Sequence, residues 1–238
     1  MPRKETESGA DHGSQQNERA TNSDATAGDR MKLTPYSEGF GPESTVFPHR
    51  LAEARIPFRY RSARLSDLVA ENTAEEEVLA NAYSYLNEER YRVPGPDNNW
   101  LYLFGPPGVG KTHSACAVAV EAIRRHVWPV HFWIVPELLA TLAPTYGTEG
   151  ETARDTLTAA KTCHLLVLDD IGAEGDTSRT IENLYVILST RDSSGLPTII
   201  TSNCSVSDLS DRNERIASRI GWRAWPIRES LGRDRRRR

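Results

Sequence analysis

Short apolar runs alternate with longer amphipathic stretches along the second half of the chain. Each run is bounded by polar residues, glycine or proline, which is typical of a strand buried on both faces of a parallel sheet and followed by a helix. The alternation therefore predicts an α/β fold. We expect strands at 100–104, 129–135, 165–168, 197–201 and 222–227, and helices at 111–126, 136–142, 151–161, 178–192 and 206–220.

The first part of the chain lacks this alternation. Residues 1–45 consist mostly of Glu, Asp, Ser, Thr, Asn, Gln and Gly, with few branched or aromatic apolar side chains. Such a segment buries too little apolar surface to offset the entropy of ordering, so the composition predicts a disordered N-terminal tail. A partner-binding arm that folds on contact is the alternative.

More apolar residues follow from position 47 onward. We expect an extended lead-in around 56–60 and 64–68, and then a helix at 75–91, where apolar residues recur at helical spacing. The predicted organisation has four segments: the tail at 1–45, the lead-in and N-terminal helix at 46–98, the α/β core domain at 99–230 and a basic C-terminal tail at 231–238.

A glycine-rich turn follows the first predicted strand of the core. Its sequence, GPPGVGKT, fits the spacing G-x-x-x-x-G-K-[ST] and precedes a predicted helix. The glycines let backbone N–H groups turn toward a phosphate, and the helix directs its positive N-terminal end at the same anion. We expect the nucleotide-binding residues to be Gly105, Pro106, Pro107, Gly108, Val109, Gly110, Lys111, Thr112 and His113.

Two residues of this turn have more specific expected roles. The Lys111 ammonium is suited to the β- and γ-phosphates, and the Thr112 hydroxyl is a suitable ligand for Mg²⁺. An unrelated glycine-rich turn between a strand and a helix is the alternative.

Two adjacent aspartates end another predicted strand, in the sequence HLLVLDDIG. Ligands of open α/β sheets bind at the carboxyl ends of the strands, so both side chains are expected at the nucleotide. We expect Asp169 to complete the metal site with Thr112, and Asp170 to polarise the attacking water. A solvated turn after the strand is the alternative.

An asparagine and an arginine complete the predicted site. Asn203 follows the strand PTIITS at the same sheet edge, where its amide can hold the water against the γ-phosphate. Arg212, Arg215 and Arg219 are expected on one face of the last helix. The specific hypothesis is that Arg219 reaches a neighbouring subunit's nucleotide, and a solvated charged face is the alternative.

Composition restricts the possible partners. The 238 residues carry a net charge of −4, so the chain is not a polycation that coats nucleic acid through charge alone. The three cysteines form no CxxC pair, which fits a reducing compartment. No apolar run approaches the roughly 20 residues that a membrane span needs, and no signal peptide is evident. We therefore expect a cytoplasmic protein with no membrane partner.

Any contact with nucleic acid must then be made through local patches. The candidate basic clusters are Arg59 with Arg61 and Arg64, Arg124 with Arg125, and Arg235 to Arg238. The candidate stacking side chains are Phe132, Trp133 and Tyr146, although one of the first two is expected to face the core. Ordinary solvated arginines are the alternative for each cluster.

Taken in order, six segments make the chain similar to the AAA+ ATPases of the DnaC/IstB type, which are bacterial and phage helicase loaders and transposition ATPases. The segments are IPFRYRSARLSDL, LFGPPGVGKTH, FWIVPELLATL, LLVLDDIGAE, LYVILSTRDSSGLPTIITSN and ERIASRI. The resemblance covers residues 52–230. It implies a three-layer P-loop NTPase sandwich with a parallel five-stranded sheet of order 5-1-4-3-2, and ATP and Mg²⁺ as cofactors.

The resemblance also implies roles for particular residues. Residues 105–112 resemble the Walker A loop, Asp169 and Asp170 the Walker B pair, and Asn203 sensor 1. Arg219 resembles the arginine finger, and residues 135–160 resemble the insertion that touches single-stranded DNA. No C-terminal lid domain is expected after Arg219, and lidless members complete their sites by assembly.

The function that the resemblance implies is an ATP-hydrolysing helicase loader. Its expected partners are a replicative helicase, single-stranded DNA and further copies of the chain. A transposition accessory ATPase of the IstB type is the main alternative, because both roles use the same domain. A metabolic P-loop kinase and an inactive nucleotide-gated adaptor are further alternatives.

Overall fold

A parallel four-stranded sheet forms the centre of the computed structural model, which describes residues 46–95, 98–143, 150–173 and 178–224. The strand order is β1-β4-β3-β2. The bounds are Trp100–Phe104 for β1, Val130–Ile134 for β2, Leu165–Ile171 for β3 and Thr198–Ser202 for β4. The ends of all four lie within three residues of the predicted ends, and their order is the 1-4-3-2 part of the five-stranded order 5-1-4-3-2 that the resemblance implies.

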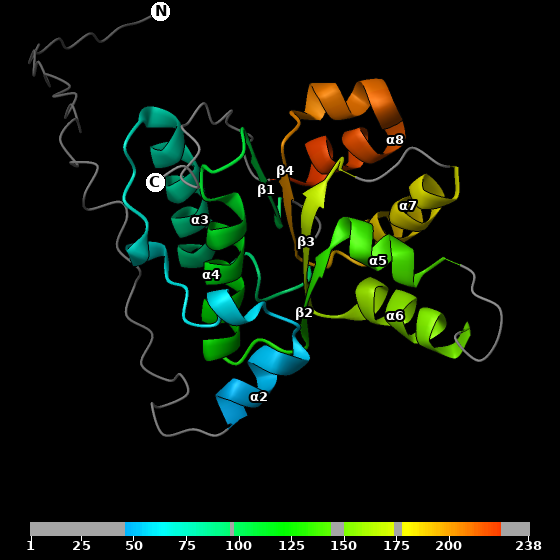
Figure 1. Ribbon diagram of the computed structural model, residues 1–238, viewed down its shortest axis with the longest axis horizontal. Helices are drawn as coiled ribbons and strands as arrows, with labels where there is room; N and C mark the ends of the chain where they lie inside the picture. Colours follow the sequence, from blue (N-terminus) through cyan, green and yellow to red (C-terminus); the bar gives the residue numbers. More distant parts are fainter. Residues whose placement is uncertain (1–45, 96–97, 144–149, 174–177, 225–238) are drawn as a thin grey trace, which may run out of the picture.

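Helices cover both faces of the sheet, which gives three layers (Figure 1). One layer contains α2 (Val46–Glu53), α3 (Thr73–Asn87) and α4 (Lys111–Arg124). The other contains α5 (Val135–Thr141), α6 (Gly150–Thr162), α7 (Ser178–Ser193) and α8 (Val206–Arg223). The described residues thus form an α/β P-loop sandwich, with the turn between β1 and α4 at one edge of the sheet.

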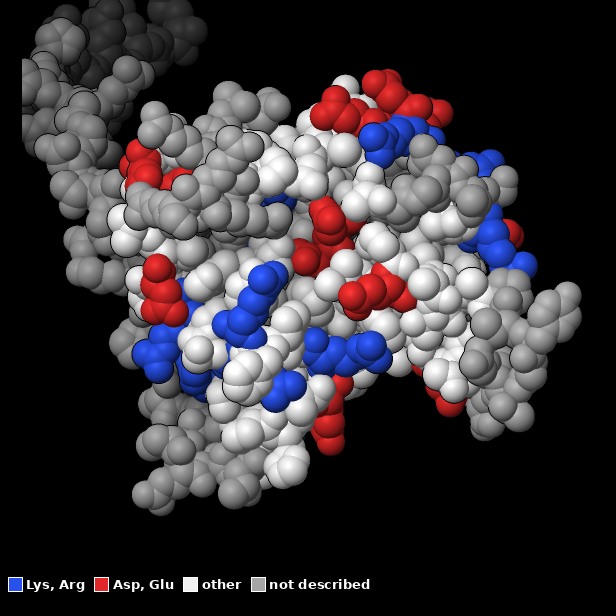
Figure 2. Space-filling model, viewed as in Figure 1, with Lys and Arg blue, Asp and Glu red and all other residues white. Residues whose placement is uncertain are grey.

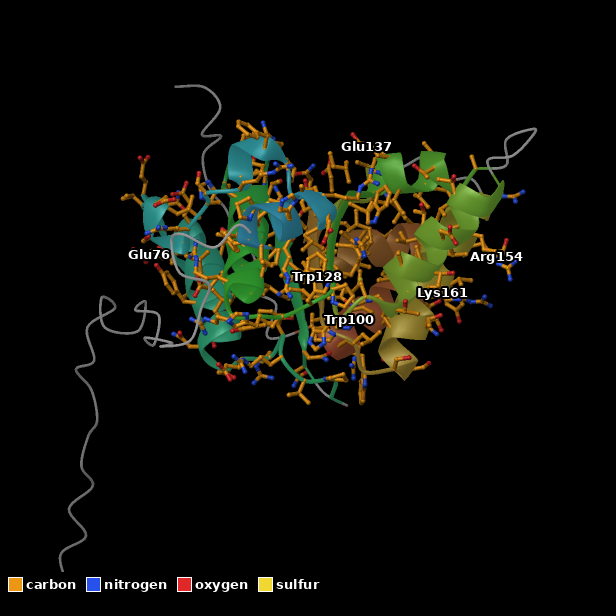
Figure 3. All side chains as sticks on the ribbon, turned by 90° about the horizontal axis from the view of Figure 1, so that it is seen from below. Glu76, Trp100, Trp128, Glu137, Arg154 and Lys161 are labelled. Carbon is orange, nitrogen blue, oxygen red and sulfur yellow. The ribbon has the colours of Figure 1, made fainter. Side chains whose placement is uncertain are left out.

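Two hydrophobic cores lie on opposite faces of the sheet, and successive side chains of a strand point alternately into one and the other. On β1, Leu101 and Leu103 pack with the α3 and α4 layer, whereas Trp100, Tyr102 and Phe104 pack with the opposite layer. Successive side chains of a strand point to opposite faces, so a run that is apolar throughout can fill both cores. Trp100 is fully buried and lies near the middle of the molecule in Figure 3.

The lead-in is more helical than predicted. Residues 46–53 form α2, and two 3₁₀-helices, η1 (Phe58–Tyr60) and η2 (Leu65–Asp67), replace the expected extended segments. Leu65 is buried, and η1 and η2 both contact α4. These short turns let a polar segment follow the surface of α4 while it places single apolar side chains in the core. The predicted helix at 75–91 ends earlier, at Asn87.

The predicted fifth strand at 222–227 is wrong at its start. Helix α8 continues to Arg223, because the buried positions Ile216, Ile220 and Arg223 follow helical spacing. Ala224 then forms a parallel bridge with Trp100, on the free side of β1. Residues 225–227 lie outside the described residues, as do the predicted tails at 1–45 and 231–238. Within the described ranges, no helix is long and apolar enough to cross a membrane.

Candidate nucleotide site

The turn between β1 and α4 has the backbone of a phosphate-binding loop. Gly105, Gly108 and Gly110 have φ angles of 142°, 90° and 93°, in the region that a Cβ makes unfavourable. Gly110 is the N-cap of α4, so the helix begins at Lys111 with its first N–H groups near the loop. Such groups are ready to bind an anion. Val109 points into the core instead, since it is 4% exposed.

The Lys111 ammonium lies inside this loop and is largely buried. Its Nζ donates hydrogen bonds to the carbonyl oxygens of Gly105, at 2.7 Å, and Pro106, at 2.9 Å. A third bond, of 2.9 Å, goes to Oδ1 of Asn203, the residue that follows the carboxyl end of β4. The predicted lysine and the predicted asparagine are therefore brought into direct contact.

Thr112 and Asp169 are also in contact. The Thr112 hydroxyl donates to Asp169 Oδ1 at 2.9 Å and lies 3.2 Å from Oδ2. Asp169 is only 7% exposed, and burial raises the pKa of its carboxyl. The hydroxyls of Thr201 and Thr112 and the charge of Lys111 oppose this rise in pKa, while the charge of Asp170 adds to it. A buried carboxylate in this position is suited to a cation.

The second aspartate is aimed by an irregularity in β3. The register of β3 against β4 shifts between Leu168 and Ile171, and Asp170 has a φ of 66°. A bulge of this kind re-aims a side chain, and such bulges are frequent next to active sites. Asp170 Oδ1 thereby accepts a hydrogen bond of 3.1 Å from Nδ2 of Asn203.

These residues surround one cavity of about 380 Å³. Its lining includes most of the predicted nucleotide-binding residues together with both aspartates and Asn203. The members from the predicted set are Pro107, Gly108, Gly110, Lys111, Thr112, His113, Asp169, Asp170 and Asn203. Figure 2 shows acidic side chains near the centre of this face and basic side chains over the lead-in segments beside them.

Five further residues that line the cavity were not predicted from the sequence as part of this site: Arg59, Tyr60, Leu68, Ile134 and Thr201. The first three come from the lead-in, which reaches over the N-terminal end of α4. Arg59, a member of one candidate basic cluster, is among the residues that line this cavity. Tyr60 and His113 meet edge to face with their ring centroids 5.8 Å apart. The available signals were the segments that contain these five residues: IPFRYRSARLSDL for the first three, FWIVPELLATL for Ile134 and PTIITSN for Thr201.

Arg219 does not line this cavity. Its guanidinium lies on α7, where it donates to the Tyr185 hydroxyl at 3.0 Å and stacks over that ring at 4.3 Å. Asp192 Oδ2 lies 3.8 Å from Nε. The predicted single arginine face is also interrupted, because Asn213 has non-helical φ and ψ angles and kinks α8. Arg212, before the kink, donates to the Gly172 carbonyl instead.

Several expected DNA contacts have other roles in the structure. Phe132 and Trp133 are both buried, so neither ring is open to a base. Arg124 and Arg125 are each ion-paired with Glu121. The insertion-like region 135–160 contains α5 and part of α6, with 144–149 outside the described residues. Tyr146 and residues 235–238 also lie outside them.

The strand order, the glycine loop and the paired aspartates define a P-loop NTPase domain. The sequence profile of the family described as IstB-like ATP binding protein matches residues 96–213. The replicative helicase loader DnaI of Bacillus subtilis is 35% identical over 142 residues, which are 54% of this chain and 45% of that protein. A putative ATP-binding protein in an insertion sequence of Mycobacterium tuberculosis is 35% identical over 105 residues, covering 43% and 40% of the two chains.

A solved structure agrees with these sequence matches. The crystal structure of DnaI superposes with a TM-score of 0.62 at 31% identity, over 73% of this chain and 94% of that one. This chain therefore belongs to the IstB/DnaC-type family of AAA+ ATPases, which are ATP-binding proteins. It spans about half the length of the curated relatives that it matches.

Proposed function

We propose that this protein is an ATP-hydrolysing helicase loader, which uses its nucleotide state to control the delivery of a replicative helicase to single-stranded DNA. In this proposal several copies assemble in the cytoplasm and complete one another's sites. The proposed ATPase activity is supported by one cavity that is lined by Lys111, Thr112, Asp169, Asp170 and Asn203.

The loop residues would bind the phosphates. Hydrogen bonds from Nζ of Lys111 to two loop carbonyls and to Asn203 hold the ammonium inside the loop, where the phosphates would lie. The N–H groups at the start of α4 would add further donors. Tyr60 and Leu68 give the same cavity an apolar wall, which suits the base of a nucleotide.

The donor set fits Mg²⁺. The Thr112 hydroxyl and the Asp169 carboxylate offer oxygen atoms, which are the ligands that this cation prefers, and the carboxylate is buried. Thr112 and Asp169 would hold the ion. When bound, Mg²⁺ supplies neutralisation of the charge on the phosphoryl oxygens.

Asp170 and Asn203 would act on the attacking water. The carboxylate of Asp170 would accept a proton from the water, and Asn203 keeps that carboxylate in place through its 3.1 Å hydrogen bond. In its own subunit Arg219 contacts α7 and does not line the nucleotide cavity. It would therefore act on the nucleotide of a neighbouring copy.

The loader part of the proposal is supported by the relative named a replicative helicase loader. The direct test mixes the protein with the replicative helicase of its own host and with circular single-stranded DNA, where the helicase cannot thread onto an end. We expect ATP-dependent transfer of helicase to the circle, and no such transfer with Lys111→Ala. Equal transfer without this protein would contradict the loader function.

A second candidate function, an accessory ATPase for transposition, is supported by the relative from an insertion sequence. Copurification from the native host followed by mass spectrometry separates the two. Recovery of a hexameric helicase supports the loader, whereas recovery of a transposase supports the alternative.

A further inference from the structure

Thr201 joins the two aspartates of the site through a single hydroxyl. Its Oγ1 accepts a hydrogen bond of 2.9 Å from the backbone N–H of Asp170 and donates one of 2.6 Å to Oδ1 of Asp169. Thr201 is 1% exposed, so water cannot replace either bond without a change in the structure.

One bond holds the backbone of Asp170 and the other holds the carboxylate of Asp169, both on β3. The Asp170 N–H belongs to the residue with a φ of 66°, at the bulge in the pairing with β4. A non-glycine residue in that region needs its surroundings to hold it. The bond to Asp169 fixes the oxygen that also accepts from Thr112. The same hydroxyl therefore holds the bulge and orients the proposed metal-binding carboxylate.

We propose that Thr201 is a positioning residue of the ATPase site, whose hydroxyl sets the separation and the orientation of Asp169 and Asp170. The inference rests on the proposed ATPase function. Thr201 acts through the aspartates: it holds Asp169 for the metal and Asp170 for the water. Side chains that orient metal ligands in this way typically contribute a factor of about 10 to 100 in metal affinity or activity.

The chain provides a matched control on the same strand. Thr198 is also fully buried in β4, and its hydroxyl accepts a hydrogen bond of 2.9 Å from Arg191. It does not line the nucleotide cavity. Thr198→Val and Thr201→Val thus remove the same group from the same strand, and only the second removal reaches the aspartates.

The test measures binding of a fluorescent ATP analogue and phosphate release while the Mg²⁺ concentration is varied. For Thr201→Val we expect unchanged analogue affinity without Mg²⁺, a Mg²⁺ requirement raised about 10-fold or more and a kcat lowered to a similar extent. Thr201→Ser retains the hydroxyl and is expected to behave as wild type. Thr198→Val is also expected to behave as wild type when the two proteins are compared at the same folded fraction. Thr201→Ala replaces the valine variant if the latter does not fold.

A second readout needs neither nucleotide nor metal. Amide hydrogen exchange in the peptide that contains Asp170 should become roughly fivefold faster in Thr201→Val, because its N–H loses its acceptor, and should stay unchanged in Thr198→Val. The inference is overturned if Thr201→Val retains the wild-type Mg²⁺ requirement, if Thr198→Val changes as much, or if Thr201→Ser does not restore activity. If wild type shows no Mg²⁺-dependent binding at all, the proposed ATPase function fails instead, and the exchange at Asp170 still decides what the hydroxyl holds.

Discussion

Lys111 Nζ and Asn203 Oδ1 lie 2.9 Å apart, so the first residue of α4 is hydrogen-bonded to the residue that follows β4. The other end of the same amide donates to Asp170 at the end of β3. One asparagine thus contacts both the group that would bind the phosphates and the group that would act on water.

The two aspartates should separate binding from turnover. Asp170→Asn is expected to leave nucleotide affinity within a few-fold of wild type and to lower kcat by about 10² or more, because it removes the carboxylate that would accept a proton. Asp169→Asn should instead weaken binding in the presence of Mg²⁺, since that carboxylate contacts Thr112. Titrations with a fluorescent ATP analogue and phosphate-release assays measure the two effects. Equal loss of binding in both variants would show that the assigned roles are wrong.

Arg219 is expected to work between subunits. Arg219→Ala should bind ATP normally and lose about 10³ in the hydrolysis rate of the assembled protein, the size of effect known for arginine fingers. Mixing it with Lys111→Ala should restore part of the ATPase activity, because the second protein supplies Arg219 and the first an intact loop. Arg215→Ala is the control, since Arg215 also lies over Tyr185, at 5.8 Å. A mixture as inactive as its components, while wild type assembles, would remove the role in trans.

Arg191 is a structural residue with an unusual environment. Its guanidinium is fully buried and donates to the carbonyls of Ala160, Cys163, His164 and Pro197, so it ties the end of α6 to the starts of β3 and β4. We expect Arg191→Met to lower the free energy of unfolding by about 2–4 kcal/mol, because several buried carbonyls lose a charged donor.

Urea denaturation measures this change in free energy. The control is Arg154→Met, on the exposed surface of α6 (Figure 3), for which a change within about 0.5 kcal/mol is expected. Similar stabilities for the two variants would contradict the structural role of Arg191.

His131 should make stability depend on pH. Burial lowers the pKa of this half-buried imidazole, and the charges of Arg55 and Arg191 lower it further. The folded protein therefore binds the proton less readily than the unfolded chain does. The stability due to the neutral form is present above the unfolded pKa of about 6.5 and is lost as the pH falls through the lower folded pKa.

The melting temperature should accordingly fall less between pH 7 and pH 5 in His131→Gln than in wild type. His49→Gln, at an exposed position on α2, reports the general effect of removing a histidine. Parallel curves for wild type and His131→Gln would contradict the prediction.

The site was easier to predict from sequence than its surroundings. Lys111, Thr112, Asp169, Asp170 and Asn203 could be expected to lie together because each lies at the end of a strand or the start of a helix, and the topology brings such positions to one sheet edge. Thr201 was missed because a buried threonine in a strand gives no pattern that distinguishes a hydroxyl with two site partners from ordinary β preference.

The lead-in and the end of α8 show a different limit. Tyr60 and Leu68 line the cavity through two 3₁₀ turns that are too short to leave a periodic signal. The segment at 222–227 alternates like a strand, yet Arg223 extends the buried stripe of α8 through bonds to Gly95 and Asn99. Those partners are more than 120 residues away in sequence, so local pattern could not identify them.

Binding of ATP in the cavity around Lys111 can be measured by an equilibrium titration with a fluorescent ATP analogue and Mg²⁺. Lys111→Ala should weaken binding by about 30-fold or more, because it removes charge-assisted hydrogen bonds worth about 2 kcal/mol. Lys161→Ala is the matched control, since that lysine lies on the outer side of α6 (Figure 3). Saturable binding by wild type and Lys161→Ala, with loss of binding in Lys111→Ala that still unfolds in a cooperative transition, is the result that we predict. Equal affinity in all three proteins would place the nucleotide elsewhere and contradict the account.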